Sequence, residues 1–259
     1  MSDHGELAAT VRETLAAVAQ RDPHHARFGA AAHRYQLAPP LDGPQVQALE
    51  ASLGVALPAD LRAFVTAVGS GGAGPAYGWI PVTRAAAAVV TAPATQTAWT
   101  RALPIAHLGC GYAAVIALDG EARGTAWIDA RVIGLVAPID GSFTGLYVDW
   151  LERLARTAWP EQVVPPGVCA LASALSGYLG VCEQQRGLPA GALAGDALRE
   201  VLSDLPPGAI EIAAEASVLY APGERVDPCL TCAQLLEALA ADGLRRDVVA
   251  PGLPPRPLR

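Results

Sequence analysis

The sequence contains no lysine, and all 18 of its basic residues are arginine. A chain without lysine cannot form the Schiff base that pyridoxal-phosphate enzymes and class I aldolases need. It also lacks the lysine of a Walker-type phosphate loop and the lysine with which protein kinases hold the phosphates of ATP. These classes of enzyme are therefore excluded, whatever the cause of the absence.

The chain has few charges and no long apolar run. Charged residues make up 17% and apolar residues 52% of its 259 residues, which excludes disorder as the main state. The Ala-Val stretch from Ala85 is cut by Pro93, so we expect no membrane span. The first residues lack a secretory pattern, and five cysteines, an odd number, favour reduced thiols. We therefore expect a cytoplasmic protein.

The balance of charge is acidic. The net charge is −7 and the isoelectric point is about 5.2. Nucleic acids and anionic membrane surfaces are poor partners for such a chain, because both carry negative charge. We expect neither as a partner, whereas a basic protein, or a basic groove on a protein, fits this charge.

Hydrophobic spacing predicts an α+β fold. Capping residues such as Asp42 with Gln45, and Ser142, mark helix starts, and β-rich runs separated by Gly or Asp-Gly turns mark strands. The expected helices cover residues 3–18, 42–54, 58–69, 142–158, 168–183, 193–205 and 232–241, and the expected strands cover 103–108, 113–118, 124–129 and 132–137. Residues 210–220 fit either a helix or a strand. A proline-rich stretch at 160–167 predicts a boundary between a domain over 1–160, with a mostly antiparallel sheet packed with helices, and a smaller, mainly helical region over 161–259.

A glycine-rich segment at residues 69–74 matches the pattern G-x-G-x-x-G. A dinucleotide-binding fingerprint must follow a strand and open a helix, whereas this segment follows a predicted helix and leads into extended chain. We therefore interpret it as a chain reversal between a helix and the sheet.

The sharpest chemical motif is a C-x-x-C pair formed by Cys229 and Cys232. Such a pair can supply two ligands to zinc or act as a redox couple, and the simplest alternative is two buried thiols. A zinc site needs further ligands, which Cys169, Cys182 or a histidine could supply. Zinc is thus the one cofactor that the residues suggest.

The same segment resembles the second half of the zinc deaminase signature, H-x-E followed by P-C-x-x-C. Pro228 precedes the cysteine pair, and Glu215 stands where the general acid/base would be. Ala213 occupies the place of the first metal ligand, so the resemblance is incomplete. A divergent zinc-dependent hydrolase in the C-terminal region is therefore an alternative function.

Several short motifs follow one another between about residues 25 and 158. They are Leu49-Glu50, Leu53-Gly54, Leu57-Pro58-Ala59-Asp60-Leu61-Arg62-Ala63-Phe64-Val65, the glycine-rich turn with Tyr77-Gly78-Trp79, Leu108-Gly109-Cys110-Gly111-Tyr112, Gly124-Thr125-Ala126-Trp127-Ile128-Asp129, and Ser142-Phe143 with Trp150-Leu151. In this order they resemble the SUKH superfamily, the SMI/KNR-type cell-wall-assembly regulator domain. The family pattern carries no catalytic residues, so the resemblance implies none here and no cofactor.

The resemblance implies a non-enzymatic protein-binding module. Bacterial members of the superfamily are commonly immunity proteins that neutralise a nuclease or deaminase toxin, and a regulatory scaffold is a further alternative. The acidic chain suits a basic toxin domain. The residues expected to lie outside the core and contact such a partner are Tyr77, Trp79, Tyr112, Asp119, Glu121 and Asp129. For Trp79, packing in the core is the alternative that we favour.

Overall fold

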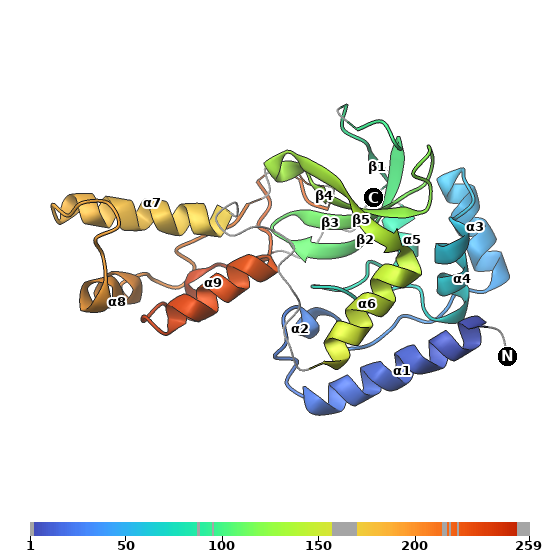
Figure 1. The fold of residues 1–259 in the computed structure, drawn as a ribbon, viewed down its shortest axis with the longest axis horizontal. Helices are drawn as coiled ribbons and strands as arrows, with labels where there is room; N and C mark the ends of the chain where they lie inside the picture. Colours follow the sequence, from blue (N-terminus) through green and yellow to red (C-terminus); the bar gives the residue numbers. More distant parts are fainter. Residues whose placement is uncertain are drawn as a thin grey trace.

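The computed structural model describes residues 3–86, 89–94, 96–156, 170–213, 217, 219–221 and 223–252. It confirms the α+β fold, because a five-stranded antiparallel sheet is packed with helices (Figure 1). The predicted boundary at 160–167 lies outside the described residues.

Helices lead the chain into the sheet. They are α1 (Asp3–Arg21), α2 (Ala30–His33), α3 (Gly43–Leu53), α4 (Ala59–Ala67) and α5 (Val82–Ala86). The predicted capping box at α3 is confirmed: the backbone N–H of Gln45 donates to Asp42 Oδ1 at 2.9 Å, and the backbone N–H of Asp42 donates to Gln45 Oε1 at 2.9 Å. Gly54 then ends α3 in a left-handed conformation with φ +65°.

The sheet is a meander in which each strand pairs antiparallel with the next. Its strands are β1 (Val90–Thr91), β2 (Arg101–Gly109), β3 (Tyr112–Ala117), β4 (Thr125–Ala130) and β5 (Leu135–Ser142). The expected strand at 132–137 is displaced, because a short 3-10 turn, Arg131–Ile133, and Gly134 at φ +73° come before β5. β5 is therefore a long edge strand, and Pro138 lies within it opposite Trp127.

Aromatic side chains fill the space between the sheet and the helix that follows it. This helix, α6 (Phe143–Ala155), starts where predicted, because Ser142 Oγ accepts the backbone N–H of Gly145 at 3.2 Å. Phe64 of α4 lies with its ring centroid 5.0 Å from Phe143 and 4.7 Å from Tyr147. α6 also packs against α1 and α4, so one face of the sheet is covered by helices (Figure 1).

The C-terminal region is mainly helical, as predicted. Its helices are α7 (Ala170–Gln185), α8 (Gly195–Ser203) and α9 (Leu230–Ala240), followed by a 3-10 turn, Arg246–Val248. They lie to the side of the sheet opposite α3 and α4 (Figure 1). The segment at 210–220 is not helical where it is described, since Ile210 and Ala213 form isolated β-bridges with Val249 and Arg225. Among the described ranges, no helix has both the length and the apolar character that crossing a membrane requires.

Candidate functional site

Three of the residues predicted to contact a partner lie in the core. Trp79, Tyr112 and Asp129 are only 3%, 2% and 1% exposed. The expectation that they lie outside the core is therefore wrong. Trp79 packs edge-on against Phe64 at 5.3 Å, and Asp129 is paired with the Arg131 guanidinium at 2.5 Å. The core alternative for Trp79 is confirmed.

Tyr77 is half-buried and is held by two elements. Its hydroxyl donates a hydrogen bond to the backbone oxygen of Pro228 at 2.6 Å, and its ring stacks on His107 with centroids 4.8 Å apart. Burial, together with nearby Asp227, raises the pKa of the Tyr77 hydroxyl above its usual range. Tyr77 therefore joins the sheet to the C-terminal region, and only part of its side chain is accessible to a partner.

The two acidic residues of the β3–β4 turn differ in what they do. Asp119 accepts the backbone N–H groups of Thr100 and Arg101 at 2.7 and 3.0 Å. Burial alone would raise its pKa, but the hydrogen bond from the Thr100 hydroxyl at 2.7 Å, together with these backbone hydrogen bonds, outweighs burial and holds the pKa at about 2. Glu121 is exposed. Of the six residues predicted to contact a partner, Glu121 is the one that is exposed.

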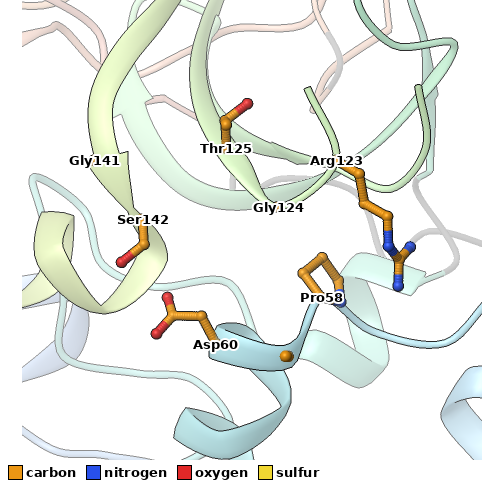
Figure 2. Close-up of a pocket in the computed structure, with 8 residues that line it drawn as sticks. Pro58, Asp60, Arg123, Gly124, Thr125, Gly141 and Ser142 are labelled. Carbon is orange, nitrogen blue, oxygen red and sulfur yellow. The ribbon is translucent and has the colours of Figure 1, made fainter. Parts of the chain in front are cut away.

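A hollow of about 340 Å³ lies beside this turn, between the start of α4 and the end of β5 (Figure 2). It is lined by Pro58, Ala59, Asp60, Arg123, Gly124, Thr125, Gly141 and Ser142. Figure 2 shows Asp60 and Ser142 at one side and Arg123 at the other. We call this feature the α4–β5 hollow.

The charged side chains of the α4–β5 hollow hold backbone groups in place. Asp60 Oδ2 accepts the backbone N–H of Thr144 at 2.8 Å and so anchors the first turn of α6. Arg123 donates to the carbonyl oxygens of Leu118 at 2.6 Å and Ala56 at 2.8 Å. Asp60 and Arg123 thus each hold two parts of the fold together. Because their charged groups already have backbone partners, the hollow is a surface of fixed shape.

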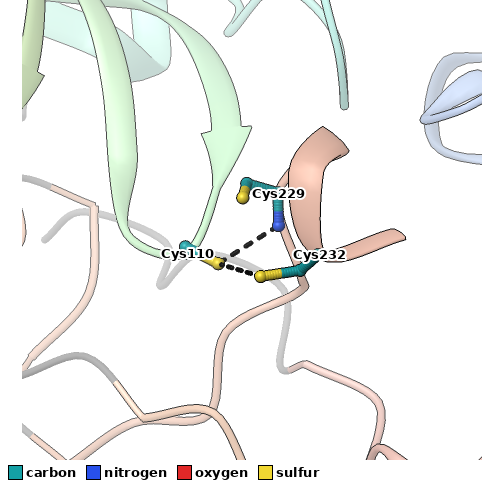
Figure 3. A group of neighbouring side chains, drawn as sticks. All are labelled: Cys110, Cys229 and Cys232. Atoms are coloured by element: carbon teal, nitrogen blue, oxygen red, sulfur yellow. Dashed lines mark hydrogen bonds between the residues drawn. The ribbon is translucent and has the colours of Figure 1, made fainter. Parts of the chain in front are cut away.

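The structure brings together three cysteines (Figure 3). Cys110, Cys229 and Cys232 are buried, and their Sγ atoms all lie within 4.8 Å of one another. The Sγ atoms of Cys110 and Cys232 are 3.8 Å apart, and the backbone N–H of Cys229 donates to Cys110 Sγ at 3.2 Å. None of the three takes part in a disulfide bond. We call them the three-cysteine cluster.

Local backbone conformation explains how the cluster forms. Cys110 lies in the tight β2–β3 turn at φ +51°, between two glycines that also have positive φ. A Cβ atom on Gly109 would lie 2.5 Å from the carbonyl oxygen of Pro228 and 2.7 Å from the Cα of Cys229, so only glycine permits this approach. The backbone N–H of Cys110 donates to the carbonyl oxygen of Asp227 at 2.7 Å, which fixes the turn against the start of α9.

The predicted set of zinc ligands agrees only in part with the cysteines that the structure brings together. Cys229 and Cys232 lie together at the start of α9, but the third sulfur comes from Cys110, which we did not predict as a ligand. Cys182 lies in α7 outside the cluster, and Cys169 lies outside the described residues. No histidine of the described ranges belongs to the cluster. The glycines on both sides of Cys110 are the sequence signal that could have indicated a tight turn there, in close contact with another segment of the chain.

Beside the cluster is a buried polar group centred on His107. Its Nε2 lies 3.1 Å from the hydroxyl of Tyr220, which comes from the C-terminal region. Burial lowers the pKa of His107 to about 4, with a smaller effect of Arg84. His107 is therefore a neutral ring that joins β2 to the C-terminal region.

Comparison with family models, with curated proteins and with solved structures gives no match to this chain.

Proposed function

We propose that the chain is a non-enzymatic protein-binding module of the SUKH type, which neutralises a toxin domain that has a basic nucleic-acid-binding surface. The observation that carries the proposal is the use of the charges around the α4–β5 hollow. Asp60 and Arg123 form hydrogen bonds to backbone groups of this chain, so they keep the contour of the hollow fixed. A partner would therefore bind by fitting this contour and by hydrogen bonding to the polar groups that line it. Such a surface suits a protein partner, which needs a fixed contour to fit.

Charge supports the same proposal. A chain with a net charge of −7 attracts a basic partner at long range, and an exposed acid at the rim of the contact surface increases the rate of association. Glu121 is such an acid, since it is exposed in the turn that also carries Arg123 of the hollow. We propose that this turn and the α4–β5 hollow meet the toxin.

The test is to co-express the chain with the nuclease or deaminase toxin encoded beside its gene, and to measure survival and complex formation. Glu121→Arg is expected to slow association about 10-fold. Glu13→Arg, at an exposed position of α1, is the matched control, because it makes the same change in net charge away from the hollow. Failure of the wild-type chain to bind or protect against that toxin would refute the proposal.

The three-cysteine cluster favours a second candidate, a zinc-dependent hydrolase related to deaminases. A deaminase needs three metal ligands and a glutamate that moves protons. Three thiols do converge here. However, the residue two positions after Cys110 is Tyr112 where the signature has glutamate, and Glu215 lies outside the described residues. Base deamination by purified wild-type protein that is lost in Glu215→Gln would favour this candidate over the binding module.

A further inference from the structure

We propose that Cys110, Cys229 and Cys232 bind one zinc ion, which fastens the start of α9 to the β2–β3 turn. The proposal does not depend on the identity of the toxin or on any activity. It assigns the three-cysteine cluster a ligand and gives the C-terminal region a fixed attachment to the sheet.

The spacing of the sulfur atoms suits zinc. Zinc–sulfur bonds of about 2.3 Å place any two sulfur atoms of a tetrahedral site about 3.8 Å apart. The Sγ atoms of Cys110 and Cys232 are 3.8 Å apart, and the third sulfur lies within 4.8 Å of both. Figure 3 shows the sulfur atoms of Cys110 and Cys232 facing each other between the turn and the helix, with Cys229 beside them. Only a small movement of Cys229 is needed to complete three corners of a tetrahedron.

The surroundings suit thiolates that are bound to a metal. Cys229 is the N-cap residue of α9, and Cys232 lies in its first turn, where the helix dipole stabilises negative charge. The backbone N–H of Cys229 also donates to Cys110 Sγ, and a hydrogen bond of this kind stabilises a thiolate ligand. Burial opposes a free thiolate, so a metal ion that offsets the charge is what makes three thiolates stable here.

The donor set selects the metal. Three soft thiolates suit zinc, copper(I) or an iron–sulfur cluster. A cluster needs inorganic sulfide as well, and we assign zinc because the sulfur spacing of 3.8 Å is that of a tetrahedral zinc site. Hard ions such as magnesium and calcium require oxygen ligands, which this set does not contain. A tetrahedral zinc ion takes four ligands, so its fourth ligand is a group other than these three cysteines.

The first measurement is the metal content of the full chain after expression in zinc-supplemented medium and gel filtration. We expect one zinc per chain in the wild type and in Cys182→Ser, and none in Cys110→Ser or Cys232→Ser. Cys182 is the matched control, because it is a free cysteine in α7 outside the cluster. Circular dichroism identifies any variant that fails to fold. The wild-type stoichiometry tests the proposal without any variant.

A second measurement replaces zinc with cobalt. A tetrahedral thiolate site is expected to give strong thiolate-to-cobalt charge-transfer bands that are present in Cys182→Ser and absent in Cys110→Ser. Removal of the metal with a chelator is expected to speed hydrogen exchange in α9 and in the β2–β3 turn, while α3 keeps its protection. Two results would overturn the proposal. One is a wild-type chain that carries no zinc after expression in zinc-supplemented medium and gel filtration. The other is a disulfide between Cys110 and Cys232 in protein purified under reducing conditions.

Discussion

Gly109→Ala provides the sharpest test of how the C-terminal region is attached. Gly109 has φ +86°, where an L-residue pays about 1–2 kcal/mol, and its new Cβ would lie 2.5 Å from the carbonyl oxygen of Pro228. Because that neighbour is backbone, the turn and the start of α9 must separate. Gly134→Ala is the matched control, since Gly134 has φ +73° and nothing within 4 Å of the position of the Cβ.

The separation puts three hydrogen bonds at risk. They are those from Cys110 N–H to the Asp227 carbonyl, from Cys229 N–H to Cys110 Sγ, and from the Tyr77 hydroxyl to the Pro228 carbonyl. At about 1 kcal/mol each, their loss adds about 3 kcal/mol to the shared conformational cost. We therefore expect Gly109→Ala to lower the free energy of unfolding by about 4–5 kcal/mol and Gly134→Ala by about 1–2 kcal/mol.

The assay is urea denaturation followed by tryptophan fluorescence, with hydrogen exchange of α9 as a local readout. If the two variants lose the same stability to within about 1 kcal/mol, the close contact at Gly109 does not hold the two regions together, and the reasoning is refuted.

Three further predictions follow from the core, the buried histidines and the α4–β5 hollow. Phe64→Ala is expected to cost about 3–5 kcal/mol in urea denaturation, because Phe64 is fully buried among aromatic rings; a loss under about 1 kcal/mol would contradict this packing. The unfolded chain takes up protons on His33 and His107 near pH 6.5, whereas burial lowers the pKa of each in the folded state to about 4, so stability is full above pH 6.5 and falls as the pH drops toward 4. Urea denaturation at several pH values measures this loss, about 3 kcal/mol for each histidine, and His107→Gln should remove about half of the slope. Asp60→Ala should cost about 1–3 kcal/mol by leaving the Thr144 N–H unpaired, whereas Asp149→Ala, at an exposed position of α6, should cost under about 1 kcal/mol.

Local capping signals predicted where α3 and α6 begin, whereas the short helices α2 and α5 were not expected. Asp42 and Ser142 each accept the backbone N–H of the third residue of their helix, so the residues that mark these helix starts also stabilise them. The strand at 132–137 was placed too early, because Gly134 in a left-handed conformation separates a 3-10 turn from β5. Propensity alone does not show which glycine will break a run of β-formers.

The candidate sites were harder to predict, because they depend on which surfaces become covered. Every residue of β3 is buried, so Tyr112 lies in the core although it follows a turn. Cys110 and Cys229 are 119 positions apart in the chain, and no spacing rule connects residues that far apart. The C-x-x-C pair could be read from the sequence, while its third sulfur required the fold.

Pro138 has a consequence for how copies of this chain behave at high concentration. β5 is the last strand of the sheet, and Leu135 at its start is 40% exposed, so this border could act as a template for another extended chain. A proline is tolerated in such a strand where its nitrogen faces away from the ladder. Pro138 has no N–H to donate, and a proline within an edge strand is one of the features that limit pairing with a further strand.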